Sequence, residues 1–164
     1  MRLIVLEQYG GVYFDTDVEL VRDLAPLLYD EGFIGFENDQ YVNSGQGIAA
    51  MPHHPVVQAM IEEYRKLHFT SADGTINAVG CPHLNTDVME RYGLVRNGKE
   101  QRVAGIHVYP AEFFNPLDSV TGKLTKTENT YSIHWYSMSW LPKSVRIRSR
   151  MGRMVRRIMK EIKR

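Results

Sequence analysis

The architecture of the chain is set by one run of residues, Gly10-Gly11-Val12-Tyr13-Phe14-Asp15-Thr16-Asp17-Val18-Glu19. Three apolar residues precede it at helical spacing, namely Leu3, Leu6 and Tyr9. The glycine pair predicts the end of that helix, because glycine tolerates the left-handed backbone of a helix C-terminus. The apolar run Val12–Phe14 predicts a short strand of the buried kind. Asp15 and Asp17 follow at its carboxyl end, where open α/β sheets bind ligands.

Two carboxylates one residue apart can converge on a single hard cation such as Mg2+ or Mn2+, which prefers oxygen ligands. A solvated turn explains an Asp-x-Asp pair equally simply, and both interpretations stay open at this point. A calcium EF-hand loop is excluded, because it needs glycine and glutamate where the chain has Leu20 and Pro26. An aspartyl-phosphate phosphatase fits poorly, since its pattern places Thr or Val at the position of Glu19. A transferase of nucleotide sugars, whose cation bridges the diphosphate, is the third metal-dependent possibility.

Strands and helices alternate along the rest of the body, which predicts an α/β fold. Strands are expected over Phe33–Glu37, Gly47–Ala50, Val103–Tyr109 and Tyr131–Tyr136. A polar loop is expected between the first two, over 38–46. Helices are expected from Pro55 to about His68, and over Asn85–Tyr92, ended by Gly93. In the last strand the alternation places Ser132, His134 and Tyr136 on one face.

Composition points to one domain without a disulfide framework. The chain has 164 residues, 43% of them hydrophobic, and a single cysteine, so no internal disulfide can form. No uncharged run approaches the ~20 residues that span a bilayer, and the start, MRLIVLEQYGG, lacks the features of a signal peptide. These observations predict a protein of the cytoplasm.

Charge divides the chain at residue 142. Residues 1–142 hold 10 Lys+Arg and 18 Asp+Glu, a net charge of −8, whereas 143–164 hold 10 Lys+Arg and only Glu161, a net charge of +9. The apolar residues of the basic part form one helical stripe: Ile147, Met151, Met154, Val155, Ile158 and Ile162. This pattern predicts an amphipathic helix lying peripherally on an anionic membrane surface. Docking onto the domain's own core is the alternative. Nucleic acid is not expected as a partner, because the segment has no aromatic residues for stacking.

The motifs resemble a known family, the glycosyltransferases with a DXD sugar-binding motif. Arg2, Leu6 and the segment 10–19 are similar to the core of the capsular-polysaccharide and initiating mannosyltransferase type, and distantly to the glucosylating clostridial toxins. The segment 132–140 resembles the closing motif of the family, a histidine followed by Ser-Trp. Gly80-Cys81-Pro82, with 84–86, resembles its middle segment.

The resemblance implies a role for each matching residue. Asp17 would ligate Mn2+ or Mg2+, Asp15 would contact ribose, sugar or metal-bound water, and His134 would be the third contact. Residues that would bind the donor are Arg2, Ser139 and Trp140. Glu37 and Asn43 flank a loop where sugar or acceptor hydroxyls could bind. Simpler interpretations also exist: a hydrogen-bonded His134, a core Trp140, a small buried Cys81, and a solvated loop at His53-His54.

The resemblance also implies a GT-A-like, Rossmann-like mixed sheet flanked by helices. The family places a nucleotide-binding half before the helix of Arg2, so the sequence is expected to lack that N-terminal half. The expected domains are therefore a partial glycosyltransferase domain, 1–142, and a basic amphipathic helix, 143–164. The expected function is transfer of a sugar, with retention, from a nucleotide-sugar donor to a glycan or lipid-linked acceptor in polysaccharide biosynthesis. An inactive or partner-dependent remnant and a Mg2+-dependent phosphohydrolase are the alternatives.

Overall fold

The computed structural model describes residues 1–68, 70, 74, 79–137, 144, 145, 147, 148, 152 and 159. The main sheet has five strands in the order β1-β4-β3-β6-β5. Their bounds are β1 Gly11–Tyr13, β3 Gly32–Asn38, β4 Tyr41–Ala50, β5 Gln101–Val103 and β6 Ile106–Tyr109. Only β3 and β6 run parallel. The predicted mixed sheet in an α/β fold is therefore present.

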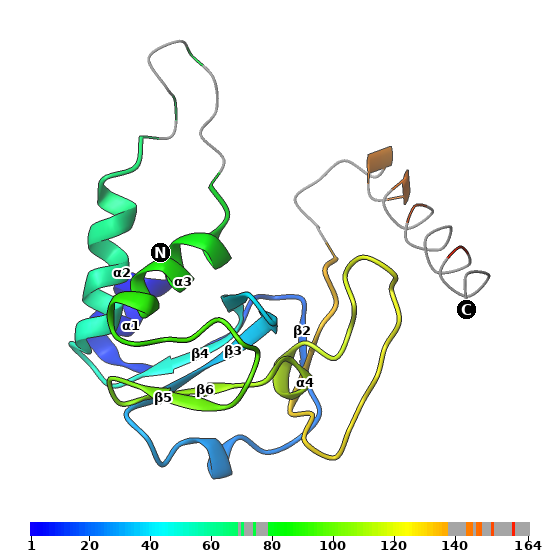
Figure 1. The fold of residues 1–164 in the computed structure, drawn as a ribbon, viewed down its shortest axis with the longest axis horizontal. Coiled ribbons are helices and arrows are strands. Elements are labelled where there is room, and N and C mark those ends of the chain that lie inside the picture. Colours follow the sequence, from blue (N-terminus) through cyan, green and yellow to red (C-terminus); the bar gives the residue numbers. More distant parts are fainter. Residues whose placement is uncertain are drawn as a thin grey trace.

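Helices α1 (Arg2–Tyr9), α2 (Pro55–Arg65) and α3 (Cys81–Arg91) lie together on one side of this sheet (Figure 1). The larger core fills the space beneath them and includes Leu6, Ile34 and Met60. The opposite face carries a smaller aromatic core around α4 (Ala111–Phe114), where the rings of Phe33 and Phe114 stack at 5.2 Å. A short 3-10 helix, η1, spans Ala25–Leu27. Neighbouring residues of β3 therefore enter different cores, as strand alternation requires.

The helix before the twin glycines is confirmed. Gly10 has φ 64, and its N–H donates to the carbonyl of Leu6, which ends α1. The buried character expected for the next strand is wrong, because β1 is an edge strand and Val12 is 40% exposed. The helix predicted from Pro55 is present but ends at Arg65.

The polar loop expected over 38–46 is wrong, because β4 begins at Tyr41. Its polar residues are buried inside the molecule with hydrogen-bond partners. The side-chain amide of Gln46 donates to the carbonyl of Phe36 (2.8 Å), and that of Asn85 donates to Ser44 Oγ (2.9 Å). Buried polar groups are tolerated when they are paired in this way.

Three further expectations need correction. The strand expected over 103–109 is a hairpin, with β5 and β6 joined at Ala104 and Gly105, both at positive φ as a type I′ turn requires. The helix expected at Asn85 begins at Cys81, so α3 starts four residues earlier. His54 does not lie in a solvated loop: it is 2% exposed and caps α2 by accepting from the Val56 N–H.

A second, two-stranded sheet pairs β2 (Val18–Leu20) with β7 (Ser132–His134) in antiparallel register. The predicted strand near residue 134 is therefore present, although shorter than expected. In the basic tail the backbone is helical at the six described residues, 144, 145, 147, 148, 152 and 159. The helix expected over 143–164 otherwise lies outside the described residues. None of the described helices has the length and hydrophobicity of a membrane-spanning segment.

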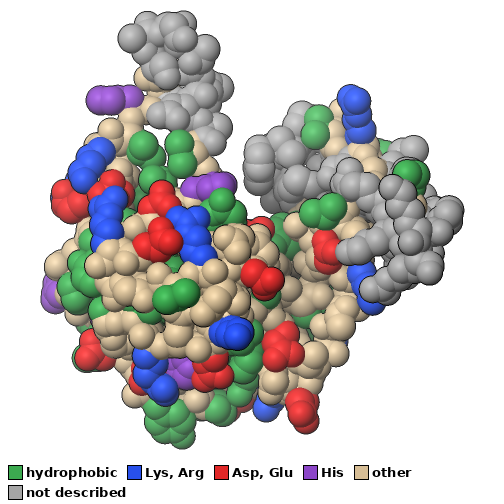
Figure 2. Space-filling model, in the orientation of Figure 1, with side chains coloured by type: hydrophobic (Ala, Val, Ile, Leu, Met, Phe, Trp, Pro, Cys, Tyr) green, Lys and Arg blue, Asp and Glu red, His purple; other side chains and the backbone are tan. Residues whose placement is uncertain are grey.

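Acidic and basic side chains are interspersed over α2 and α3 on the face seen in Figure 2. Ion pairs join several of them, including Glu63 with Lys66 and Arg96 with Glu90. On this face, the described surface therefore shows no continuous basic patch of the kind that binds nucleic acid. The absence of a nucleic-acid partner stays a prediction.

Candidate metal and donor site

The twin acids lie where β1 leaves the main sheet for the small one. The Asp15 N–H donates to the carbonyl of Gly45 on β4 (2.9 Å), and the Val18 N–H donates back to the carbonyl of Asp15 (3.1 Å). These two bonds fix the turn between β1 and β2. Immediately after it, Val18 stands opposite His134 in the β2–β7 pairing. The chain therefore carries Asp17 to the side of His134.

Three side chains predicted to contact one metal ion are brought together. Asp15, Asp17 and His134 each offer a ligand atom, and these atoms lie within 4.8 Å of one another. His134 Nε2 is 3.3 Å from Asp17 Oδ1. In the part of the chain that the structure describes, no other such group of His, Cys, Asp or Glu occurs.

The surroundings of Asp17 favour its ionised form. Partial burial tends to raise the pKa of this carboxyl, but the backbone hydrogen bond from Ser137 and the nearby His134 outweigh burial, so the net pKa lies below its ordinary value. The Ser137 N–H donates to Asp17 Oδ2 at 2.8 Å. The backbone carbonyl of Asp17 also accepts from the Trp135 N–H at 3.0 Å. These two hydrogen bonds thus hold the segment that follows β7, residues 135–137, against Asp17.

Asp15 is held by two side chains that the sequence places close to it. The Tyr13 hydroxyl donates to Asp15 Oδ1 (2.8 Å), and Arg2 Nη2 lies 3.1 Å from the same oxygen. The guanidinium also stacks over the Tyr13 ring, 4.9 Å from its centroid. Burial, with the hydrogen bond to Asp15, raises the pKa of Tyr13, so this hydroxyl stays protonated and can donate.

The residues fit a divalent cation on two grounds. Two carboxylates so close together repel each other unless positive charge lies between or beside them. His134 is only 7% exposed, and its Nδ1 has no hydrogen-bond partner among the described residues. Two carboxylates and an imidazole form a mixed oxygen and nitrogen ligand set, which Mn2+ or Mg2+ could share with water and a diphosphate.

Glu37 and Asn43 lie beside this cluster, but each is engaged with the protein itself. Asn43 Nδ2 donates to Glu37 Oε2 (3.2 Å), and Asn43 Oδ1 accepts from the Gly45 N–H (2.7 Å). The Tyr136 hydroxyl lies 3.3 Å from Glu37 Oε1. Contact of either residue with a sugar or acceptor stays a prediction.

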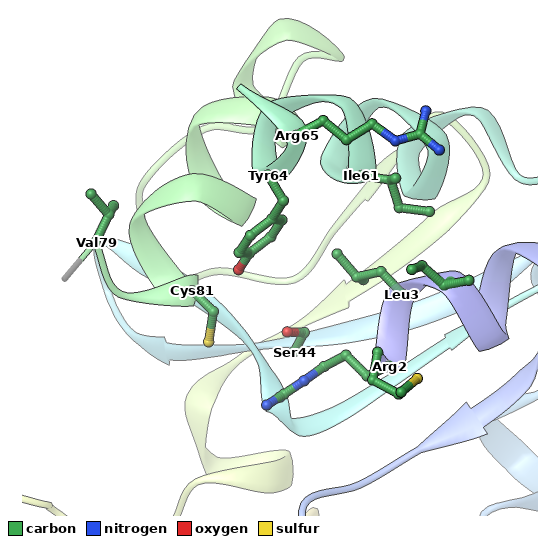
Figure 3. Close-up of a pocket in the computed structure, with 10 residues that line it drawn as sticks. Arg2, Leu3, Ser44, Ile61, Tyr64, Arg65, Val79 and Cys81 are labelled. Carbon is green, nitrogen blue, oxygen red and sulfur yellow. The ribbon is translucent and has the colours of Figure 1, made fainter. Parts of the chain in front are cut away.

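Arg2 also lines a pocket of about 440 Å³ (Figure 3). Its residues come from α1, α2, the start of α3, β4 and the residues just before α1 and α3: Met1, Arg2, Leu3, Ile4, Ser44, Ile61, Tyr64, Arg65, Val79 and Cys81. Burial raises the pKa of Tyr64 to about 12 and also raises that of Cys81, so both groups stay neutral. Cys81, expected to be buried, is half-buried in this wall.

Arg2 is the residue that the pocket and the acidic cluster share. Its Nη2 is paired with Asp15, while its Nη1 is buried without a partner among the described residues. A buried guanidinium nitrogen without an acceptor is costly, so a phosphate or hydroxyl oxygen of a ligand would be favourable there. The role of Arg2 in donor binding stays a prediction.

Some site residues were missed from the sequence, and two predicted ones lie outside the structure's description. Ser139 and Trp140 are outside the described residues. Tyr13 and Gly45 were not singled out, although Tyr13 stands within the Asp-x-Asp segment. Asn115, which contacts Tyr136, carries no signal in the sequence.

Comparisons with known proteins point to glycosyltransferases. Residues 1–34, which contain Arg2, Asp15 and Asp17, match the family described as a glycosyltransferase sugar-binding region containing a DXD motif. A human alpha-1,4-N-acetylglucosaminyltransferase is 32% identical over 71 residues, which is 43% of this chain and 19% of that protein. A lactosylceramide 4-alpha-galactosyltransferase of Rattus norvegicus is 27% identical over 117 residues, 71% of this chain and 30% of that protein.

An uncharacterized protein of Arabidopsis thaliana is 30% identical over 121 residues, 73% of this chain and 18% of that protein. The chain thus spans less than a third of the length of each of these relatives. No solved structure matches it significantly. These similarities support the predicted glycosyltransferase family, whereas the capsular and mannosyltransferase subtypes stay predictions.

Proposed function

We propose that this chain forms the metal- and donor-binding part of a glycosyltransferase, which moves a sugar from a nucleotide sugar to a glycan or lipid-linked acceptor. One observation carries the proposal: Asp15 and Asp17, at one end of the chain, and His134, more than 100 residues later, offer ligand atoms within 4.8 Å of one another. The agreement of residues 1–34 with the DXD family supports the same function.

Departure of a nucleoside diphosphate develops negative charge on its terminal phosphate. Mn2+ or Mg2+, when bound, would stabilise that charge. The protein's own part is to hold its carboxylates ionised and fixed, as the Ser137 N–H does for Asp17. Arg2 would add its unpaired Nη1 as a donor to a phosphate or sugar oxygen at the border of the pocket.

The proposed acceptor and the proposed anomeric configuration of the product are suggested by the names of the related transferases. Both named transferases form alpha linkages by their names, and one acts on lactosylceramide, a glycolipid. By analogy, we propose transfer to a glycan or lipid-linked glycan. An alpha-linked donor and an alpha-linked product would mean that the anomeric configuration is retained. No nucleophile is assigned.

The proposal is tested with an isosteric pair of variants, Asp17→Asn and Asp39→Asn. Asp39 is an exposed acid in the turn between β3 and β4 and serves as the control. Mn2+ affinity, measured by loss of the free-ion EPR signal, should fall more than about 10-fold in Asp17→Asn and stay unchanged in Asp39→Asn. Hydrolysis of a panel of nucleotide sugars should depend on the cation and fall in the same variant.

Three results would contradict the proposal. Absence of Mn2+ and Mg2+ binding would remove its basis. Metal binding without affinity for any nucleotide would instead favour an inactive or partner-dependent remnant. Release of phosphate from simple phosphoesters would favour the Mg2+-dependent phosphohydrolase.

The basic segment 143–164 is part of the proposal as a peripheral anchor on an anionic membrane surface. Its net charge of +9 and its apolar stripe support this role. The full chain should sediment with anionic vesicles but not with neutral ones, and a chain lacking 143–164 should sediment with neither. Equal sedimentation with both vesicle types would contradict an electrostatic anchor.

A further inference from the structure

Tyr136 adopts a backbone conformation that a bulky residue rarely takes. Its φ is 48, in the left-handed region, where a non-glycine residue is strained. The bend follows directly after β7, which ends at His134. It lies between the two backbone hydrogen bonds to Asp17, one from the Trp135 N–H at 3.0 Å and one from the Ser137 N–H at 2.8 Å. The strained residue thus turns the backbone so that the N–H groups on either side of it, those of Trp135 and Ser137, both point to Asp17.

The side chain of Tyr136 covers the imidazole of the cluster. The centroids of the Tyr136 and His134 rings are 4.1 Å apart, with an angle of 36° between the ring planes. His134 makes no hydrogen bond through Nδ1 among the described residues, so such a bond does not fix the orientation of its ring. Packing against the tyrosine ring therefore limits how the imidazole can turn.

The tyrosine is itself fixed from the main sheet. Its hydroxyl donates to Asn115 Oδ1 (2.9 Å) and lies 3.3 Å from Glu37 Oε1. Asn115 Nδ2 donates to the backbone carbonyl of Glu37 (2.9 Å), and Asn43 Nδ2 donates to Glu37 Oε2 (3.2 Å). Both carboxylate oxygens of Glu37 thus face side chains of the protein, Oε2 that of Asn43 and Oε1 that of Tyr136.

We propose that Tyr136 is a positioning residue, held by Asn115 and Glu37, which orients His134 and aims the Ser137 amide at Asp17. The inference rests on the proposed metal site. It also gives Glu37 a different role from the predicted contact with a sugar or acceptor, because the carboxylate acts on the cluster through Tyr136. A residue that fixes ligand orientation contributes to metal affinity even though it does not touch the metal.

The test uses Tyr136→Phe in the full chain, which keeps the ring and removes the hydroxyl. Mn2+ affinity should fall about 10-fold, and the ring-nitrogen NMR signals of metal-free His134 should shift or broaden. Tyr92→Phe is the matched control, because the Tyr92 hydroxyl also donates to a carbonyl, that of Pro55, but joins the end of α3 to the start of α2 and contacts no residue of the cluster. It should change neither quantity.

Asn115→Ala, which removes the closer acceptor of the Tyr136 hydroxyl, should weaken Mn2+ binding in the same direction and serves if Tyr136→Phe folds poorly. If the unaltered chain binds Mn2+ and both variants bind it equally well with unchanged His134 signals, the positioning role is wrong while the proposed function stands. If the unaltered chain itself binds neither Mn2+ nor Mg2+, the metal site fails and the positioning role fails with it.

Discussion

Replacing Gly45 with alanine should damage the cluster while leaving the strand intact. Gly45 lies on β4 outside the positive-φ region, so its backbone accepts a side chain. A Cβ atom there would overlap Asp15 Oδ2 and lie 3.1 Å from both Arg2 Nη1 and Asn43 Oδ1. The carbonyl and N–H of Gly45 are both hydrogen-bonded, to Asp15 N and to Asn43 Oδ1, so the strand cannot easily slide away. The Asp15 carboxylate must therefore move.

The size of the effect follows from that overlap. Restoring an ordinary contact requires the carboxylate to move by roughly 1 Å, whereas metal–ligand distances tolerate only about 0.2 Å. We expect the dissociation constant for Mn2+ to rise about 10- to 100-fold, equivalent to about 1.4–2.7 kcal/mol. Folding stability should change less than a full core defect would, because the Asp15–Arg2 pair is 28% and 29% exposed and contributes about 0–1 kcal/mol.

Gly80→Ala is the matched control, since a Cβ there meets only Pro82 Cδ at 3.6 Å and His83 Cδ2 at 3.7 Å, both ordinary contacts. Mn2+ titration followed by EPR, with thermal unfolding of each variant, separates loss of the site from loss of the fold. Mn2+ affinity of Gly45→Ala within twofold of that of the unaltered chain would refute the reasoning, because Asp15 could not then be a ligand held in place beside Gly45.

Two further substitutions, at Arg2 and at Asp30, should each change a measured quantity in a defined direction. Arg2→Met removes the cation beside Asp15, so Mn2+ should bind the chain alone about fivefold more tightly, by roughly 1 kcal/mol, while nucleoside diphosphate affinity falls. Calorimetry checks both, and Arg96→Met, which also removes an arginine stacked on a tyrosine and paired with acids, should change neither. The hydrogen bond from Arg102 holds the pKa of Asp30 below its ordinary value of 3.8, so this carboxylate stabilises the fold above that value and less as pH falls through its lower folded pKa. Urea unfolding of Asp30→Asn should therefore depend less on pH below about 4 than that of the unaltered chain, and parallel pH profiles would contradict this.

Local signals in the sequence predicted the parts of the fold that local chemistry determines. Gly10 ends a helix because of its positive φ, and Pro55 begins one because its ring suits the first helical turn. The error at β4 has the opposite origin. Ser44 and Gln46 are polar enough to indicate a loop, yet their partners, Asn85 and a carbonyl of β3, come from segments that only folding brings near.

The residues of the candidate site also differ in how far the local sequence reveals them. Asp15 and Asp17 could be identified because a strand leads directly into both of them. His134 could be identified only through the ordered family motif, since no local pattern distinguishes it from a surface histidine. Asn115 could not be identified, because its role depends entirely on the contact with Tyr136.

The pairing of β2 with β7 is the physical link between the two ends of the site. Each strand has three residues, and an isolated pair of strands is only marginally stable in water. A slip of one residue would turn His134 to the opposite face, away from Asp17. The bond of Trp135 Nε1 to Glu19 Oε2 (2.9 Å) and the two backbone bonds to Asp17 fix the register. In the proposed site, a cation would join Asp17, which directly precedes β2, to His134 on β7. It would therefore bind the paired form and stabilise it by about 2.7 kcal/mol at a concentration 100 times its dissociation constant. The proposal thus couples metal affinity to strand register, and changes that loosen β7 should weaken metal binding even where they touch no ligand.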